Sequence, residues 1–419
     1  MRTIARANAT SRERERTIEL DRSLVHGCAG VALYYSWRAA TFAASWIDAP
    51  LLGAIPETPL PTLSIVVPAR NEERSIERCV RSLLAQEWLD FEVIVVDDRS
   101  SDSTAHILAR LAREDARLRV VRGEPLPPGW VGKPWALVQG ERHARGSWLL
   151  FTDADSTHAT RGAVSMLWLA TRAGVDAASI ATHQELGTFW ERAVLPSILG
   201  MILYVAGPLG AINDPTKPRQ ALANGQYILV SRRAYDALGG HAALRGEIVE
   251  DIAFARRIKD DGRFRYILVG GRSIASVRMY RSFDEIWLGF TKNVYIGANG
   301  NLAALGLGVA FMLLISIVPP ALAARALVRR RYPEAIEAVA CTIAIIATAS
   351  WGMRRAGFSR KLALLQPLGC AIFAAIIANS TFSVLTGRGV SWRGRTYHAA
   401  TAPDATGNAG RLAAAQFED

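Results

Sequence analysis

Short hydrophobic runs alternate with amphipathic stretches along residues 62–155 of this chain. The runs are continuously apolar and rich in β-branched residues, and stretches with apolar residues at helical spacing separate them. Strands of this kind, separated by helices, are typical of a mostly parallel sheet covered on both faces, so an α/β domain is predicted. The predicted strands are 63–67, 91–96, 118–122 and 148–152, and the predicted helices are 71–86, 103–113, 135–144 and 251–259.

The pattern changes near residue 300, where long apolar runs begin. Runs at 302–322, 335–349 and 362–385 are separated by basic loops and predict three transmembrane helices, of which the middle one is the shortest. The apolar stretch 24–46 is expected to be a further membrane or interfacial helix, although Arg38 interrupts it.

These changes divide the chain into four predicted parts. Within the second part, the apolar stretch 195–212 contains proline and glycine and is interpreted as an interfacial or buried segment. The parts are a tail with a possible membrane or interfacial helix (1–60), the α/β domain (61–285), an interfacial segment with about three transmembrane helices (286–387) and a C-terminal tail (388–419).

Composition and charge agree with a membrane protein. Half of the 419 residues are hydrophobic and the mean hydropathy is +0.13. The net charge is +11, but the basic residues are scattered and form no nucleic-acid-binding signature, which favours a membrane surface or an anionic substrate over nucleic acid. The four cysteines form no CxxC pair, which argues against a zinc site or a structural disulfide.

The strongest chemical signal is the pair Asp153 and Asp155 at the end of an apolar strand. Residues two apart in an extended strand point to the same face, so both carboxylates are expected to reach one ligand. Hard divalent cations prefer such oxygens and keep positions open for phosphates, so Mn²⁺ or Mg²⁺ is expected here. The alternative is an ordinary acidic turn.

Other polar residues follow or precede the predicted strands. Asp97 and Asp98 end the second strand, where a nucleotide is expected to bind, although a turn with a helix cap explains them equally well. Lys133 precedes the strand that ends at Asp153 and is expected to reach a phosphate, or else it is a solvated surface lysine.

Two further candidates lie later in the chain. Asp251 opens a predicted helix, where it could remove a proton from an acceptor hydroxyl or simply compensate the helix dipole. Arg278 precedes the first predicted span, where it could contact a diphosphate, anionic lipid headgroups or only solvent.

The order of these motifs resembles the family-2 glycosyltransferases. The motifs are VVPARNE (66–72), VVDDRSSD (95–102), GKPWAL (132–137), FTDAD (151–155) and VED (249–251), and the resemblance covers roughly residues 62–285. It implies a GT-A fold, in which a Rossmann-like sheet binds a nucleotide sugar and a divalent cation, and an inverting transfer in a single displacement.

The resemblance also implies a role for each residue. Asp251 corresponds to the general base, Asp153 and Asp155 correspond to the metal ligands, and Asp155 is the more direct one. The implied donor-binding residues are Pro68, Asn71, Glu72, Asp97, Asp98, Lys133, Asp153 and Arg278.

A finer resemblance links the chain to bacterial hopene-associated glycosyltransferases. It rests on LPPGWVGKPWAL (126–137), RMYRSFDEIWLGFTKN (278–293) and the C-terminal apolar runs. The QxxRW motif of processive polymer synthases is absent, since only Arg278 fits it.

This resemblance implies a UDP- or GDP-linked sugar donor, a lipid acceptor and a multi-pass protein of the bacterial inner membrane, with a cytoplasmic catalytic domain. The acceptor is expected to be hopanoid-related. The alternatives are a carotenoid, sphingoid or polyprenyl-phosphate acceptor, and a non-catalytic membrane scaffold.

Overall fold

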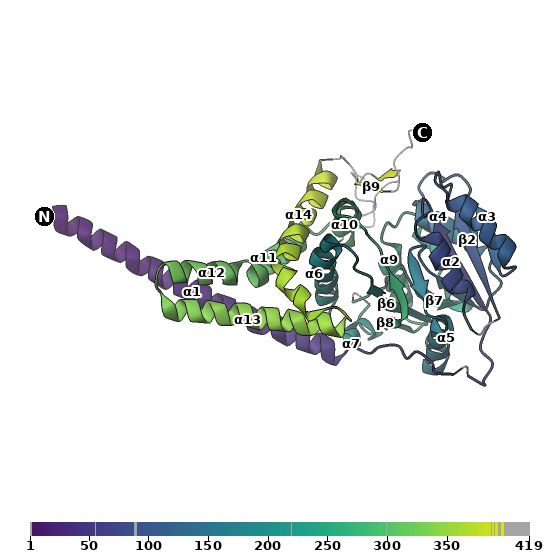
Figure 1. Ribbon diagram of the computed structural model, residues 1–419, viewed down its shortest axis with the longest axis horizontal. Helices are drawn as coiled ribbons and strands as arrows, with labels where there is room; N and C mark the ends of the chain where they lie inside the picture. Colours follow the sequence, from purple (N-terminus) through teal and green to yellow (C-terminus); the bar gives the residue numbers. More distant parts are fainter. Residues whose placement is uncertain are drawn as a thin grey trace. The chain divides into compact units, whose positions relative to one another are not determined.

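The structure is a computed structural model that describes residues 2–54, 56–87, 90–218, 220–298, 300–386, 388, 390–392 and 395–397. The chain forms two compact units (Figure 1). The first, called here the helical unit, comprises residues 1–44, 192–204 and 302–377. The second, called here the sheet unit, comprises residues 45–191, 205–301 and 378–419. Most of the tail 388–419, including 398–419, lies outside the described residues.

The sheet unit is built on one eight-stranded sheet in the order β3-β2-β1-β4-β7-β6-β8-β5. The first four strands of this order are parallel to one another, β7 is antiparallel to both neighbours, and β5 is antiparallel to β8. The predicted mostly parallel α/β fold is therefore confirmed. The strands are β1 (Leu63–Ala69), β2 (Phe91–Asp97), β3 (Leu118–Arg122), β4 (Trp148–Phe151), β5 (Ser156–His158), β6 (Ala177–Gln184), β7 (Ile228–Ser231) and β8 (Tyr266–Val277).

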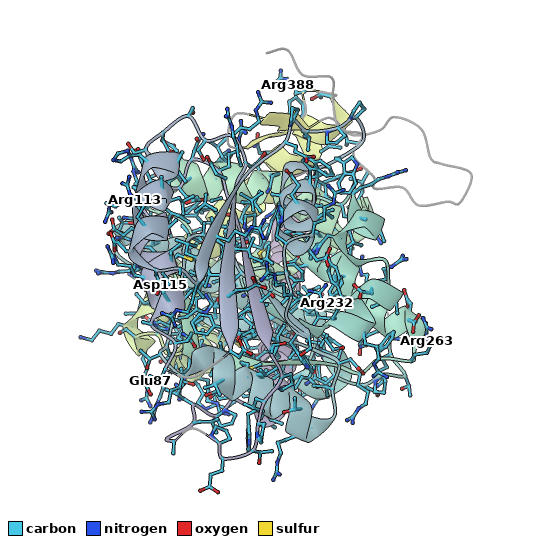
Figure 2. All side chains as sticks on the ribbon, turned by 90° about the vertical axis from the view of Figure 1, so that its right-hand side faces the viewer. Glu87, Arg113, Asp115, Arg232, Arg263 and Arg388 are labelled. Atoms are coloured by element: carbon cyan, nitrogen blue, oxygen red, sulfur yellow. The ribbon has the colours of Figure 1, made fainter. Side chains whose placement is uncertain are left out.

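Helices cover both faces of this sheet because each central strand is apolar on both sides. On one face Ile65, Val67 and Leu150 pack with α2, α3 and α5. On the other face Val66 and Leu149 pack with α4, α8 and α9. Charged side chains such as Arg113, Asp115 and Arg263 lie at the rim of the unit (Figure 2). The helices are α2 (Ile76–Leu84), α3 (Thr104–Glu114), α4 (Gly132–Glu141), α5 (Gly162–Ala173), α7 (Leu209–Ile212), α8 (Arg232–Ala237), η1 (Gly240–Leu244), α9 (Glu250–Asp261) and α10 (Phe283–Gly297), and a short hairpin pairs β9 (Val390–Trp392) with β10 (Arg395–Tyr397).

Two helix boundaries differ from the prediction. The helix expected over 71–86 begins only at Ile76, because Asn71 has a left-handed φ of 54° and its backbone N–H bonds to Ser100. The helix expected to begin at Trp135 already begins at Gly132, because Pro134 is tolerated within a first helical turn. Lys133 therefore lies on a helix and not in a loop.

The helical unit contains α1 (Arg2–Ala44), α11 (Leu302–Ser316), α12 (Val318–Val328), α13 (Tyr332–Arg355) and η2 (Arg360–Leu365), together with parts of α6 (Phe189–Ala206) and α14 (Gln366–Leu385). Among the described residues, three helical segments are long and apolar enough to cross a membrane, and a fourth is a pair bent by 44°. These segments are Phe189–Ala206, Tyr332–Arg355, Arg360–Leu385 and the pair α11 with α12.

The observed helices agree with the predicted spans in part. The middle run lies in α13, an unbroken helix of 24 residues, which is shorter than the 26-residue candidate span Arg360–Leu385, as predicted. The first run bends at Ile317, where Pro319 and Pro320 cannot donate backbone hydrogen bonds to the preceding turn. The stretch 195–212, interpreted above as interfacial or buried, is mostly helical: α6 continues through Pro196 and is among the candidate spans, and α7 covers Leu209–Ile212.

Candidate active site

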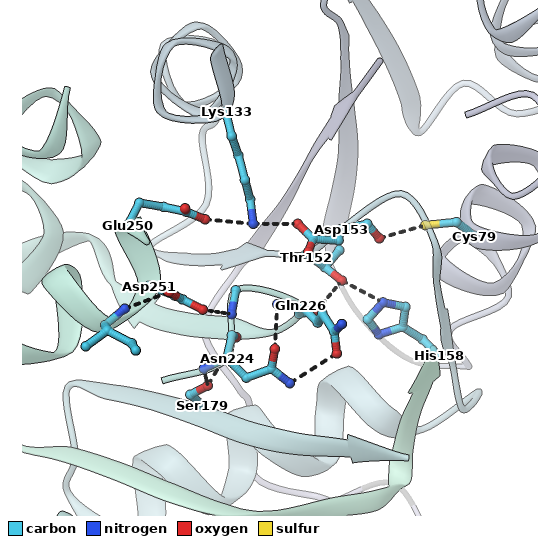
Figure 3. A network of polar contacts seen from close by, with 12 residues as sticks. Cys79, Lys133, Thr152, Asp153, His158, Ser179, Asn224, Gln226, Glu250 and Asp251 are labelled. Carbon is cyan, nitrogen blue, oxygen red and sulfur yellow. Dashed lines mark hydrogen bonds and ion pairs between the residues drawn. The ribbon is translucent and has the colours of Figure 1, made fainter. Parts of the chain in front are cut away.

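A lysine joins two carboxylates in the sheet unit. Lys133 Nζ lies 2.8 Å from Asp153 Oδ1 and 2.7 Å from Glu250 Oε1 (Figure 3). The Glu250 side chain is only 6% exposed, whereas Asp153 and Lys133 are 28% and 31% exposed. The cluster therefore has a buried side and an open side.

Three elements bring these groups together. Lys133 lies in the first turn of α4, Glu250 opens α9, and Asp153 follows β4. Figure 3 shows the lysine extending from its helix to a position between the two carboxylates.

The prediction that the aspartate pair lies in an extended strand is wrong, because the pair lies in a turn. Strand β4 ends at Phe151, and residues 153–155 form a turn that the Ser156 N–H closes onto the Asp153 carbonyl at 3.2 Å. In this turn Ala154 is buried while Asp153 and Asp155 are partly exposed. The turn, and not strand alternation, gives both carboxylates access to solvent.

Asp251 is held beside this cluster by backbone donors. Its Oδ2 accepts from the Gly225 N–H and its Oδ1 from the Ile252 N–H, each at 2.8 Å. Burial, together with the negative charge of Glu250, raises the pKa of Asp251 to about 6. A carboxyl with this pKa can accept a proton near neutral pH.

Gly225 is a site residue that the sequence did not single out. A Cβ at this position would lie 2.8 Å from Lys133 Nζ and 3.2–3.3 Å from the carboxylates of Glu250 and Asp251. Only a residue without a side chain lets the backbone approach the cluster this closely. The segment ANGQ (223–226) offered no recognisable signal in the sequence.

The charges within the cluster perturb one another. Burial raises the pKa of Asp153 against the opposing effect of Lys133. Burial also acts to raise the pKa of Glu250, but Lys133 outweighs it and the pKa is lowered. For Lys133 the surrounding carboxylates overcome burial and raise its pKa. The protonated Lys133 side chain therefore lies between the carboxylates of Asp153 and Glu250 and is stabilised by both.

Lys292 of α10 is a second cation near this site that the sequence did not single out. Its ammonium interacts electrostatically with Glu250, Asp153 and Asp251, and burial lowers its pKa to about 8. A lysine with this pKa remains mostly protonated at pH 7 and can attract an anionic group.

Buried polar side chains stabilise the turn that contains Asp153. Thr152 Oγ1 donates to the Gln226 carbonyl at 2.7 Å and lies 3.0 Å from His158 Nε2. Burial lowers the pKa of His158 to about 4, so this imidazole is neutral at pH 7. The Gln226 side chain in turn accepts from Thr182 and Asn224. These contacts fix the turn that carries the aspartates.

The residues predicted to bind the nucleotide lie at the same edge of the sheet as Asp153. Asp97 pairs in register with Ala69 of β1, and Phe151 pairs with Val66, so Asp153 emerges at the same carboxyl edge. Two strand spacings separate β2 from β4, which is roughly 10 Å. Asp97 and Asp98 are 7% and 4% exposed.

Hydrogen bonds join the predicted residues around β1 to this edge. Asn71 Oδ1 accepts from the Ser101 N–H at 2.8 Å, and the Glu72 N–H donates to Thr104 Oγ1 at 2.8 Å. Pro68 is partly buried in β1, opposite Val96. Asn71 and Glu72 thus help to fix the loop that carries Asp98.

The structure places Arg278 in a buried ion pair. Its guanidinium donates to both oxygens of Glu191, at 2.9 and 3.2 Å, and the Glu191 side chain is fully buried. Gly187 lies against this pair, since a Cβ there would overlap the guanidinium. Arg278 is thereby engaged within the sheet unit, and among the described residues its hydrogen bonds go to Glu191 and not to Lys133 or Asp153.

A metal fits the aspartate turn only if other ligands complete its coordination. No group of three or more His, Cys, Asp or Glu side chains that could hold a metal occurs in the described part of the chain. Magnesium-type sites need only one or two carboxylates when phosphates and water supply the rest. The carboxylates of Asp153 and Asp155, whose side chains are partly exposed although Asp155 Oδ1 is buried, fit that donor set.

A cavity of about 250 Å³ elsewhere in the sheet unit contains none of the predicted residues. Val138, Glu141, Tyr235 and His241 are among its lining residues. The Lys133 cluster carries the charged groups, so the chemistry is assigned to the cluster and not to this cavity.

Comparison with known proteins identifies the class of enzyme. Residues 64–234, which run from within β1 through β7, match the family model described as glycosyl transferase family 2. This chain is a glycosyltransferase.

The similarity to known relatives of this glycosyltransferase covers more of the chain than the family model does. The 4,4'-diaponeurosporenoate glycosyltransferase of Staphylococcus aureus (strain USA300) is 27% identical over 341 residues, which cover 80% of this chain and 88% of the relative.

Two solved structures are similar to the glycosyltransferase at lower identity. A mannosyltransferase from Pyrobaculum calidifontis, in complex with GDP-Man and Mn²⁺, is 20% identical, covers 88% of this chain and 98% of that one, and has a TM-score of 0.49. The S. aureus TarS 1–349 structure in complex with UDP-GlcNAc is 16% identical, covers 81% and 95%, and has a TM-score of 0.38.

Proposed function

We propose that this glycosyltransferase transfers a sugar from a UDP- or GDP-linked donor to a membrane lipid, with a carotenoid-type carboxylic acid as the acceptor. The similarity to the S. aureus 4,4'-diaponeurosporenoate glycosyltransferase over 80% of the chain carries this proposal. The candidate spans support a membrane location. The proposal places the enzyme as a multi-pass protein in the bacterial inner membrane, with the sheet unit in the cytoplasm.

The donor is proposed to bind along the carboxyl edge of the sheet. Asp97 and Asp98 face the nucleoside, with Pro68, Asn71 and Glu72 shaping their loop, and Lys133 contacts the diphosphate as a point charge. A divalent cation held by Asp153 and Asp155 would neutralise charge on the leaving diphosphate when bound. Arg278 positions this region through its pair with Glu191.

The acceptor chemistry decides what Asp251 has to do. A hydroxyl must lose its proton as it attacks the anomeric carbon, and Asp251, with a pKa of about 6, can accept it. A carboxylic acid with a pKa of about 4.3 is already ionised at pH 7 and needs no base. Lys292 is suited to hold such a carboxylate.

A hydroxylated acceptor, such as a hopanoid-related lipid, is the second candidate. The geometry of Asp251, a carboxyl held by two backbone donors beside the cluster, favours it. The two candidates leave different products: a sugar ester is cleaved by mild alkali, whereas a glycoside of an alcohol is stable.

The test uses the purified full-length enzyme in detergent with UDP- and GDP-sugars and Mn²⁺. A carotenoid carboxylic acid and a hydroxylated hopanoid are offered together, and the products are identified by mass spectrometry before and after mild alkali. An alkali-labile carotenoid product supports the proposal, and exclusive formation of an alkali-stable hopanoid product replaces it with the second candidate. The Asp155→Ala variant is the control, and full activity in that variant would remove the metal assignment.

A further inference from the structure

An arginine of the helical unit forms no ion pair with a carboxylate of any described residue. Arg38 of α1 donates from its guanidinium to the Tyr204 carbonyl at 3.0 Å, and its guanidinium carbon lies 5.4 Å from the centre of the Tyr204 ring. Arg38 takes part in no ion pair with another described residue. Charged groups in membrane segments normally face a partner, so its counter-charge has to come from elsewhere.

Three buried polar atoms in this part of the unit lack a hydrogen-bond partner among the described residues. They are Arg38 Nε, the Tyr204 hydroxyl, which lies near the Arg38 side chain, and Gln366 Oε1. The Tyr204 ring lies 5.7 Å from that of Tyr35, whose hydroxyl the Gln366 side chain reaches. Buried polar groups are nearly always satisfied, so an unsatisfied group beside an unpaired cation indicates a ligand.

Basic side chains gather at the end of the helical unit that contains Arg38. Ser36 of α1 bonds to Thr348 of α13 at 2.8 Å, and Arg355 donates to the Ala43 carbonyl at 3.2 Å, so the C-terminal ends of α1 and α13 lie together (Figure 1). Arg354 and Arg355 end α13. Arg360 and Lys361 follow in η2 and are exposed.

The acidic residues of this unit lie elsewhere. Its segments contain acids only at 13, 15, 19, 21, 334 and 337. Glu334 begins α13 and pairs with Arg22, and Glu337 pairs with His26. A helix of 24 residues is about 36 Å long, so these acids cannot neutralise the basic end.

Aromatic residues indicate that the basic end lies at the membrane surface. Tyr34, one turn before Arg38, and Trp37, directly before it, are 51% and 59% exposed with their rings 6.0 Å apart. Tyr204 lies two residues before the end of the candidate span Phe189–Ala206. Tyrosine and tryptophan concentrate at headgroup depth, where lipid phosphates also lie.

We propose that Arg38, Tyr204 and Gln366 form a binding site for the phosphate of an anionic phospholipid, with Arg354 and Arg355 at its entrance. The guanidinium supplies a fixed donor fork for the phosphate oxygens, and the tyrosine hydroxyl supplies a further donor. The glutamine carbonyl oxygen accepts from a headgroup hydroxyl, which phosphatidylglycerol possesses. This lipid is distinct from the acceptor, so the site is independent of the proposed function.

The test titrates phosphatidylglycerol onto the delipidated full-length protein in detergent and counts bound lipids by native mass spectrometry. Phosphatidylcholine is the zwitterionic comparison. Arg38→Gln is expected to weaken phosphatidylglycerol binding about tenfold or more, since a hydrogen bond to a charged group contributes roughly 1.5–3 kcal/mol. The matched control Arg22→Gln removes the same charge from the other end of the bundle and is expected to bind as the unchanged protein does.

Two conservative variants distinguish a loss of lipid binding from misfolding of the protein. Arg38→Lys keeps the charge but loses the fork and is expected to bind with intermediate affinity, and Tyr204→Phe keeps the ring and is expected to bind a few times more weakly. Equal binding by Arg38→Gln and the unchanged protein would overturn the proposal, as would equal weakening in Arg22→Gln. Displacement of the lipid by an equal concentration of inorganic phosphate would show a site for free phosphate instead.

Discussion

Replacing Lys133 by methionine separates its structural role from its chemical role. The change leaves Glu250, which is 6% exposed, without the cation that lies 2.7 Å away. Breaking a buried pair by removing one partner costs about 3–5 kcal/mol. Lys133 and Asp153 are about one-third exposed, so solvent reduces the cost, and about 1–3 kcal/mol is expected at pH 7.

The sign of the pH dependence follows from Glu250. In the unchanged enzyme its pKa is lowered, so its stabilising contribution is present above the pKa of the unfolded chain and is lost as pH falls through the folded pKa. Without Lys133 the largest opposing charge is gone, and burial acts to raise that pKa against only the backbone hydrogen bond of Glu250 and the neighbouring His241 and Lys292. The variant is then expected to gain stability relative to the unchanged enzyme as pH falls from 7 towards about 4.3.

The double variant Lys133→Met with Glu250→Gln gives the decisive comparison. It contains no uncompensated Glu250 charge, so thermal unfolding in detergent, followed by tryptophan fluorescence, is expected to return towards the unchanged melting temperature. Transfer activity is expected to stay about 10²–10³-fold down, since a donor to the leaving diphosphate is still missing. Recovery of activity together with stability would refute this reasoning and leave Lys133 only a charge-balancing role.

Three further predictions concern neighbouring groups. With a hydroxyl acceptor, Asp251→Asn should lower the rate about 10²–10⁴-fold and abolish the rise in rate as pH increases through about 6, where the base becomes ionised; an unchanged pH profile would contradict this. Gly225→Ala should raise the donor KM about tenfold, because its Cβ would lie 2.8 Å from Lys133 Nζ, whereas Gly246→Ala, with its nearest atom at 4.0 Å, should not. Arg278→Met should destabilise the enzyme by about 3 kcal/mol in thermal unfolding, and additional replacement of Glu191 by glutamine should recover part of it; no loss in the single variant would disprove the pair's role.

The proposed acceptor and the proposed phospholipid bind to different groups of this enzyme. A carotenoid-type acid has to bring its carboxylate to the Lys133 cluster, where Lys292 can attract it. The phospholipid phosphate is held by Arg38 in the helical unit, whose residues do not overlap with the cluster. Arg38→Gln and Asp251→Asn should therefore affect lipid retention and catalysis independently.

Several features follow from the sequence because they depend on local pattern. Continuous apolar strands such as 91–96 require a sheet covered on both faces, and the structure confirms it. The apolar runs after residue 300 are long enough for membrane helices, and most of their residues lie in the candidate spans. The hydrophobic pattern placed Asp97 and Asp153 at strand ends, and pairing register brings both to one edge of the sheet.

Only the tertiary structure decided which side chains act on one another. Periodicity cannot show that Lys133 bridges Asp153 and Glu250, since these residues are up to 117 positions apart (250 minus 133). Gly225 and Lys292 carry no local signal, because closeness to the cluster is a property of packing between distant segments. Asn71 can adopt its left-handed conformation locally, but the hydrogen bond from its N–H to Ser100 Oγ joins two loops that are far apart in the sequence, so only the tertiary structure reveals it.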